Sequence, residues 1–116
     1  MMTGKKEAMD EIEKHIADKV ENVVNYCKSE IVQRGAKASG AYTANINVSI
    51  NQPNWDFDPD KKSDVQTHFK VTDPFANYYV SSGAPYALRL EHGWSKKQPI
   101  GLFNIVANAA ISKFYR

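Results

Sequence analysis

A long run of helical periodicity near the N-terminus limits what this chain can fold into. Between residues 5 and 34, apolar side chains recur every three or four positions, and charged residues fill most of the gaps. These apolar side chains are Met9, Ile12, Ile16, Val20, Val23, Cys27 and Ile31. The mean spacing of about 3.7 residues is typical of a straight helix rather than a left-handed coiled coil. We therefore expect a long amphipathic helix that lies on a sheet or along a neighbour, ended by Gly35 in the left-handed conformation.

Three segments after this helix have the pattern of strands. Residues 43–51 alternate strictly, with one face formed by Ala44, Ile46, Val48 and Ile50 and the other by Asn45, Asn47, Ser49 and Asn51. A loop is expected over residues 52–63. The period of two resumes over residues 64–72, which predicts a second strand. The aromatic segment 75–82 predicts a third strand, ended by Gly83.

The rest of the chain predicts two helices. Pro85 suits the first turn of a short helix that places Leu90 on its apolar side, runs through His92 and ends at Gly93. After a polar loop, a helix begins near Ile100 and is apolar around most of its circumference, so we expect it to be mostly buried. The predicted fold class is α+β, in one domain spanning residues 1–116. It has a long N-terminal helix, a small antiparallel sheet of two to four strands, and a short helix and a C-terminal helix packed on the sheet.

The composition is that of a globular protein, because 42% of the residues are hydrophobic and 24% are charged. No apolar run approaches the roughly 18 residues that a membrane span needs, so we expect no membrane partner. The first residues have no apolar segment of the kind found in signal peptides, which predicts synthesis in a cytoplasm. The single cysteine, Cys27, excludes an internal disulfide.

The residues that could carry catalysis or bind a metal form no recognisable set. Asp56, Asp58 and Asp60 resemble the start of a calcium loop, but the glycine and glutamate that such a loop needs are missing, so we interpret them as a solvated turn. The three histidines are His15, His68 and His92, and none has metal-ligand spacing from another. Cys27 lies on the apolar stripe and is interpreted as a core residue. We therefore predict no enzyme, no cofactor and no metal site.

The charge is distributed unevenly. Residues 75–116 contain five basic residues and one acidic residue, a net charge of +4, although the whole chain is only +2. The basic residues are Arg89, Lys96, Lys97, Lys113 and Arg116, and they lie among aromatic residues. This mixture suits either nucleic acid or a protein interface, and five cations without a nucleic-acid-binding motif favour protein contact.

The segment from Pro85 to Val106, PYALRLEHGWSKKQPIGLFNIV, resembles a tract typical of bacteriophage tail-completion proteins, the neck or head-to-tail joining family of long-tailed phages. The matching residues are Pro85, Tyr86, Ala87, Leu90, Glu91, Gly93, Trp94, Ser95, Lys96, Gln98, Pro99 and Gly101. Lys97 is an extra residue relative to the commonest form of the tract. Upstream, residues 39–45 look like the family's entry to its first strand, with Ala41 near the place where an arginine is common.

The resemblance implies a structural virion protein, one of several copies that form a ring in the phage neck. Its partners would be copies of itself, the portal-side connector, and the tail terminator or tail tube, and DNA would pass through the ring without being specifically bound. The residues expected to contact partners are Tyr86, Leu90, Glu91, Gly93, Trp94, Ser95, Lys96, Lys97, Gln98, Pro99, Leu102 and Phe103. We expect this tract to form a rigid turn, with Glu91 accepting hydrogen bonds from backbone N–H groups or from lysine.

Two alternatives remain open at this point. A tail terminator, which caps a finished tail tube, shares the small α+β build. A small nucleic-acid-binding protein would use the basic final third and would bind DNA with a steep dependence on salt. A nuclease would need a cluster of carboxylates or histidines, which the sequence lacks.

Overall fold

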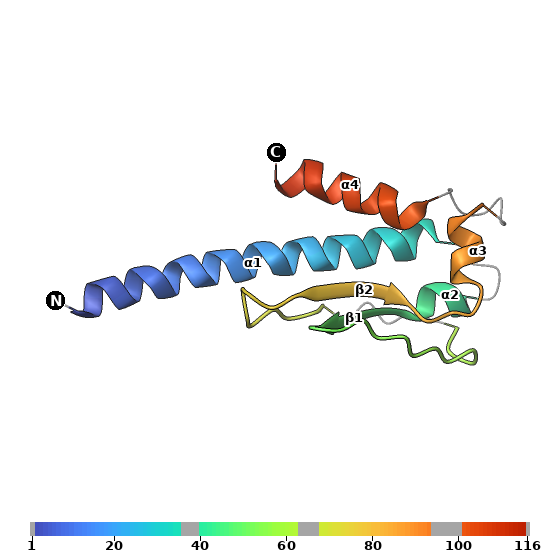
Figure 1. The fold of residues 1–116 in the computed structure, drawn as a ribbon, viewed down its shortest axis with the longest axis horizontal. Coiled ribbons are helices and arrows are strands. Elements are labelled where there is room, and N and C mark those ends of the chain that lie inside the picture. The colour runs from blue at the N-terminus through green and yellow to red at the C-terminus, as the bar shows by residue number, and fades with distance from the viewer. Residues whose placement is uncertain (1, 36–39, 63–67, 94–100, 116) are drawn as a thin grey trace.

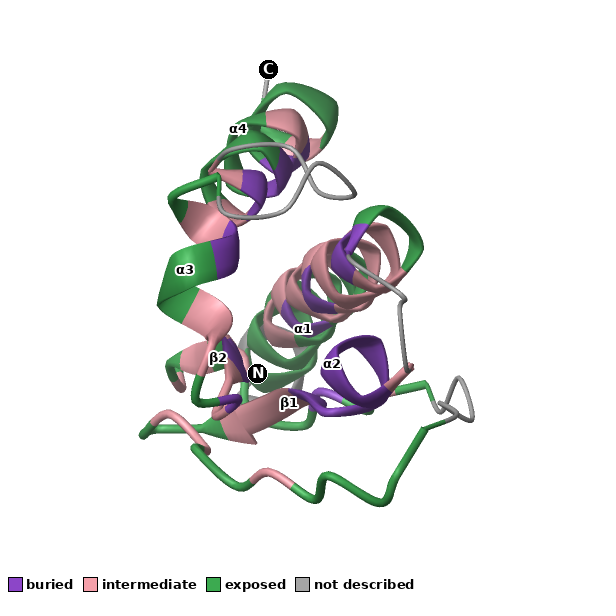
Figure 2. Cartoon of the chain, turned by 90° about the vertical axis from the view of Figure 1, so that its right-hand side faces the viewer, coloured by how far each residue is buried: buried purple, intermediate pink, exposed green. Residues whose placement is uncertain are grey.

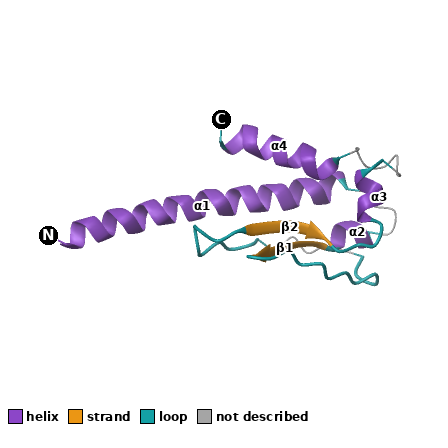
Figure 3. Cartoon of the chain, viewed as in Figure 1, coloured by secondary structure: helices purple, strands orange, loops and turns teal. Residues whose placement is uncertain are grey.

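The computed structural model describes residues 2–35, 40–62, 68–93 and 101–115, with side chains from residue 6 onward. Its elements follow one another as helix α1 (Met2–Arg34), helix α2 (Ala41–Ala44), strand β1 (Ile46–Ile50), strand β2 (Tyr78–Ser82), helix α3 (Ala87–Glu91) and helix α4 (Leu102–Phe114) (Figures 1 and 3). The α+β class and the order of elements confirm the prediction from the sequence.

Helix α1 is much longer than the elements that pack on it. At 1.5 Å per residue, its 33 residues span about 50 Å, whereas a strand of five residues spans roughly 17 Å. The C-terminal half of α1 therefore covers the sheet, and the N-terminal turns extend beyond the body (Figure 1). Met9 and Ile12, expected on the packed face, are 51% and 53% exposed because the sheet ends before it reaches them.

Strands β1 and β2 are antiparallel, with Val48 opposite Val80. Their alternation places Val48 and Val80 on the side of α1 and Asn47 and Ser81 on the side of the loop that follows β1. The described strands form a sheet of two, which is the lower limit of the prediction. Because an isolated two-stranded sheet is marginal in water, packing on α1 supplies most of its support.

The core lies where the C-terminal end of α1 meets α2, α3 and α4 (Figure 2). It contains Ile31, Tyr42, Ile46, Ala84, Leu90, Leu102 and Val106. Helix α4 runs antiparallel to α1 and packs mainly on it, rather than on the sheet as expected (Figure 1). Its buried side chains lie along one face, and Ile105 and Ile111 are exposed, so the expectation of a mostly buried helix was wrong for the opposite face.

The first strand begins later than its alternation suggested. Residues 41–44 form α2, and β1 begins at Ile46. Gly40 precedes α2 with a φ of 83°, which glycine adopts without strain. All four α2 side chains are buried, so tertiary packing determines this turn of helix. Gly35, in contrast, is not left-handed as predicted; the glycine is needed because a Cβ there would lie 2.8 Å from the Ile31 carbonyl oxygen.

The second predicted strand is wrong over residues 68–72, which have no strand partner; residues 64–67 lie outside the described residues. Side chains of α1 take the place of a partner strand. Asn25 accepts a hydrogen bond from the Phe69 N–H at 2.8 Å and donates to the Phe69 carbonyl at 2.9 Å. Glu21 accepts one from the Val71 N–H at 2.8 Å. The segment keeps alternating burial, with Phe69 and Val71 inward, because α1 holds it in an extended form.

The polar face of β1 holds the loop that follows it. The Asn45 side chain donates to the carbonyls of Ala41 and Asp58 at 2.7 and 2.9 Å, and its oxygen accepts from the Asp58 N–H at 2.9 Å. Asn47 donates to the carbonyls of Asn54 and Asp56 at 3.0 and 2.9 Å. Asn45, just before β1, and Asn47, within it, therefore both bind the backbone of the loop that follows the strand.

Replacing Asn45 with Asp tests this arrangement. Aspartate keeps the oxygen that accepts from Asp58 but loses the donor to two carbonyls, one of them in the buried α2. We expect the free energy of unfolding in urea to fall by about 1–3 kcal/mol, the usual cost of an unsatisfied buried group. The control is Asn108→Asp on the exposed face of α4, which should change it by no more than about 0.5 kcal/mol. Equal losses in both variants would contradict the role of Asn45.

Glu21 links stability to pH. The His68 side chain, 2.7 Å away, lowers the pKa of Glu21 below its ordinary 4.5, and the Val71 N–H and Lys70 lower it further. The unfolded chain therefore binds this proton more readily, so the stabilisation is complete above about pH 4.5 and is lost as the pH falls through the folded pKa.

We expect Glu21→Gln to lower the urea midpoint at pH 7, and the difference from the parent chain to shrink below pH 4.5. The control is Glu11→Gln, in the exposed N-terminal turns of α1 that extend beyond the body (the α1 overhang). It should leave the urea midpoint unchanged. A difference between parent and Glu21→Gln that stays constant down to pH 3 would show that the charge of Glu21 contributes nothing.

Candidate functional site

Most of the described residues of the tract from Pro85 to Val106 lie on helices α3 and α4, and Glu91 connects these two helices. The Glu91 carbonyl accepts a hydrogen bond from the Gly101 N–H at 2.8 Å, and its carboxylate accepts one from the Phe103 N–H at 3.1 Å. The carboxylate thus occupies the N-terminus of α4, where the orphan N–H groups and the helix dipole favour negative charge. The expectation that Glu91 accepts backbone hydrogen bonds is confirmed.

The two glycines of the tract flank the loop that Glu91 closes. Gly93 and Gly101 have φ values of 90° and 68°, in the left-handed region that side chains with a Cβ rarely adopt. Gly93 ends the turn after α3, as predicted, and Gly101 precedes the first residue of α4. The ends of this loop are therefore held by backbone geometry together with two hydrogen bonds.

Several residues expected to contact partners instead support the turn. Leu102 has an exposed fraction of 0%, and Leu90 also lies in the core. Tyr86 packs its ring 6.0 Å from Phe57 and 6.2 Å from Tyr42, and burial raises the pKa of its hydroxyl. Because both leucines are buried, they cannot contact a partner directly in this structure, and they instead position the turn. The other predicted contacts, Trp94, Ser95, Lys96, Lys97, Gln98 and Pro99, lie outside the described residues.

An apolar groove of about 510 Å³ opens beside this turn, between the end of β2, α3 and the start of α4. Phe103 and Glu91 line it from the tract, and Trp55 and Leu88 line it with side chains that are 64% and 73% exposed. We call this surface the α3 groove. Its volume lies within the roughly 300–1,000 Å³ of ligand-binding pockets, and it is far more open than a buried cavity.

Trp55 lies in the loop expected over residues 52–63 and was not among the residues expected to contact a partner. Because tryptophan is enriched among interface hot spots, its residue type was a signal of an interface anchor. Gly83 explains its position: a Cβ on Gly83 would collide with the Trp55 carbonyl oxygen, so the loop crosses the chain at a point that only glycine permits. Ser81 also donates to the Asn54 carbonyl at 2.8 Å. The close approach to Gly83, just after β2, and the hydrogen bond from Ser81 in β2 therefore fix the backbone at Trp55 beside the α3 groove.

The described basic residues of the final third do not form one patch. Arg89 lies on α3, and Lys113 lies near the C-terminal end of α4, roughly 17 Å along that helix from its first residue. Lys113 stacks over the Tyr26 ring at 5.3 Å, and Tyr26 packs edge-on against Phe114 at 5.6 Å. Lys113 thus joins α4 to α1 and is partly engaged within the protein.

Among the described residues, no group of three or more His, Cys, Asp or Glu side chains could hold a metal ion. Burial raises the pKa of the Cys27 thiol, and the side chain packs against the core, as expected. His68 is exposed, and it is paired with Glu21. None of the helices described is both long and apolar enough to cross a lipid bilayer.

Comparison with known proteins returned no relative: no family model matches the chain, and no curated protein or solved structure matches it. The proposed family therefore depends on the residues of the tract and on their structural roles.

Removing the Glu91 carboxylate should loosen the α3–α4 turn. We expect Glu91→Ala to lower the free energy of unfolding by about 0.5–2 kcal/mol, the usual effect of losing a helix cap. Glu91→Gln should lose less, because its amide oxygen still accepts from Phe103. Urea titration followed by circular dichroism measures both, with Glu11→Ala on the α1 overhang as the control. A ranking in which Gln is as damaging as Ala would mean that the hydrogen bond to Phe103 contributes little.

Proposed function

We propose that this chain is a structural protein of the phage neck, one copy in a ring that joins the head to the tail during assembly. The observation that carries the proposal is the sequence of the tract from Pro85 to Val106, which resembles that of the tail-completion family. In this role the protein would be non-catalytic, and DNA would pass through the ring without sequence-specific contact.

The structural roles of the tract residues support this proposal. Glu91 and Gly101, two of its matching positions, are hydrogen-bonded to each other, and Gly93 adopts the left-handed backbone. Leu90 and Leu102 anchor the turn in the core. The described matching residues on either side of the loop belong to one turn, so their order along the chain has a physical reason.

The exposed apolar surface also favours an assembly protein. Met9, Ile12, Trp55, Leu88, Ile105 and Ile111 are all exposed large hydrophobic residues. Lys113 is the single charged residue of α4, so the outer face of that helix is uncharged over most of its length. A small domain that leaves such surface open gains stability when copies or partners cover it.

The deciding experiment is electron microscopy of a lysate in which this gene alone is silenced in its parent phage. The neck role predicts DNA-filled heads lying beside complete, separate tails, and an unaltered copy supplied in trans should restore joined particles. Abnormally long tails would instead indicate a tail terminator. Normal infectious particles would refute a role in the neck, and salt-dependent DNA binding by the purified chain would then favour the nucleic-acid alternative.

A further inference from the structure

The outer edge of β2 presents a row of backbone groups. The Asn51 N–H donates to the Asn77 carbonyl at 2.7 Å, which makes these two residues a hydrogen-bonded pair of the antiparallel ladder. Because such pairs alternate along the ladder, the N–H and C=O groups of Tyr78, Val80 and Ser82 point away from β1. Within the described parts of the chain, none of these backbone groups makes a hydrogen bond. This edge of the sheet is therefore open to a further strand.

Two apolar pockets lie beside this open edge. One is the α3 groove, and the other is a pocket of about 230 Å³ between β2, α1 and α4. Val80 and Phe103 line both pockets, so the pockets adjoin, and we call them together the β2 cleft. Figure 2 shows β2, α3 and α4 on the same side of α1. Four side chains of α1 line the second pocket: Val23, Val24, Cys27 and Ile31.

An extended segment matches both features of the cleft. Its backbone pairs with the row of N–H and C=O groups on β2, while its alternate side chains face the apolar pockets. The side chains opposite Tyr78, Val80 and Ser82 would lie on the face of the sheet that α1 covers. A helix or a small apolar ligand would fill the pockets but leave the edge of β2 without partners, since a helix satisfies its own backbone groups.

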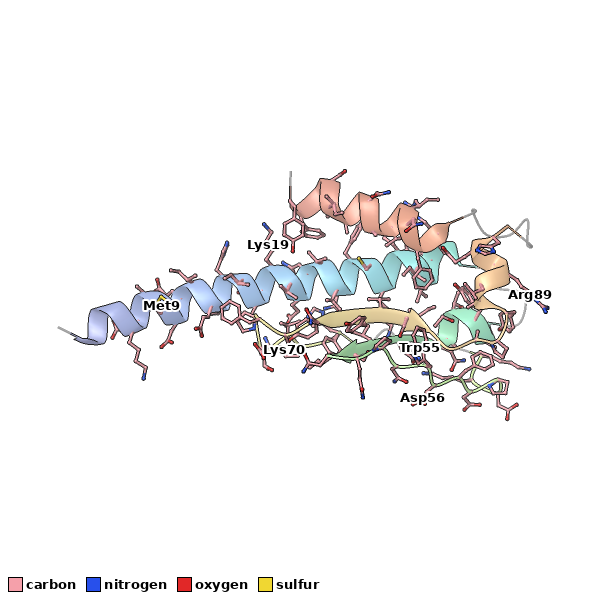
Figure 4. All side chains as sticks on the ribbon, in the orientation of Figure 1. Met9, Lys19, Trp55, Asp56, Lys70 and Arg89 are labelled. Atoms are coloured by element: carbon pink, nitrogen blue, oxygen red, sulfur yellow. The ribbon has the colours of Figure 1, made fainter. Side chains whose placement is uncertain are left out.

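The charge of the cleft defines one end of the occupant. Glu91 is the only charged side chain among the described residues that line the two pockets. One of its carboxylate oxygens accepts from the Phe103 N–H, and the other makes no hydrogen bond to the described residues. Glu91 and Trp55 both line the pocket at the end of the sheet where β2 ends and the chain continues into α3 (Figure 4). A basic side chain at this end of the occupant would be attracted, and a carboxylate would be repelled.

We propose that the β2 cleft binds an extended segment of a partner protein, which adds to β2 as an antiparallel strand. Alternate apolar side chains of this segment fill the two pockets, and an Arg or Lys at its N-terminal end pairs with Glu91. The antiparallel direction is the more stable per residue. One added strand would also turn the described sheet of two into a sheet of three, which gains stability. This binding mode goes beyond the neck role and does not depend on it.

Fluorescence anisotropy with a labelled synthetic peptide tests the proposal. The probe is RTVTVTV, capped at both ends, and its control is RTTTVVV, which has the same composition without the alternation. We expect RTVTVTV to bind the full-length chain at micromolar concentrations and RTTTVVV to bind at least about tenfold more weakly, because it cannot pair with the edge and fill the pockets together.

Val80→Pro removes an outward N–H that β1 does not use, and its ring blocks the edge, so RTVTVTV should bind at least about tenfold more weakly. The matched control is Val48→Pro, the same change at the position opposite Val80, which alters the outer edge of β1 and should leave binding unchanged. Circular dichroism checks that both variants fold. Glu91→Gln should weaken the binding of RTVTVTV several-fold without changing that of QTVTVTV.

Hydrogen exchange followed by NMR reads the pairing in the unaltered chain, so the test does not depend on the folding of Val80→Pro. Saturating RTVTVTV should slow exchange of the Val80 amide at least about tenfold and leave the Val48 amide unchanged. Slowing at Val48 instead of Val80, equal affinity for the two peptides, or no binding of RTVTVTV at millimolar concentration would overturn the proposal. Sedimentation that shows dimers of the unaltered chain and monomers of Val80→Pro would also overturn it, because a second copy would then occupy the edge.

Discussion

Helix α1 is the element on which the other packed parts of the structure depend. The two-stranded sheet, the extended segment 68–71 and α4 each contact it, and each is too small to be stable alone. A domain of this size has little apolar surface to bury. One long helix that packs against several elements therefore gives them a common core. Removing α1 would leave a two-stranded sheet, a short extended segment and an amphipathic helix with no common surface.

Side chains complete the backbone hydrogen bonding that a larger sheet would supply. Asn25 pairs with both backbone groups of Phe69, and Asn45 pairs with both backbone groups of Asp58. The Glu91 carboxylate likewise accepts a hydrogen bond from a backbone N–H in the first turn of α4. An asparagine amide has a donor and an acceptor in the geometry of a peptide group, so it can mimic a neighbouring strand at one residue. Each such contact depends on a single side chain, so one substitution can remove it.

These contacts also explain which features the sequence could predict. The helix over α1 and the strand over residues 46–50 both appear in the structure, although Ile50, expected on the apolar face of the strand, is 41% exposed. The alternation of residues 68–72 also reports burial, but burial does not reveal whether the backbone partner is a strand or the side chains of Asn25 and Glu21. The alternation of β1 likewise shows that one face of the strand is polar, but it does not show that this face hydrogen-bonds to the loop after the strand.

The candidate site was predictable where local backbone chemistry determines it. One turn contains Glu91, Gly93 and Gly101, which all lie within eleven residues of the chain. Their order along the sequence therefore carried information about this turn. Trp55 and Leu88 reach the same surface from separate segments, so only the fold brings them together with Phe103. The exposure of Met9 likewise depends on where the sheet ends, which the helical period of α1 does not encode.

Helix α1 holds the two ends of the molecule in a fixed relation. Its exposed N-terminal turns lie at one end, while Ile31, near its other end, packs with Leu90 and Leu102 in the core. A helix bends only gently unless a proline or a similar interruption is present, and α1 contains no proline. The exposed N-terminal turns are therefore held at a nearly constant angle to the core. In the proposed ring, a rigid subunit of this kind favours a constant angle between successive copies, which allows a series to close rather than to grow irregularly.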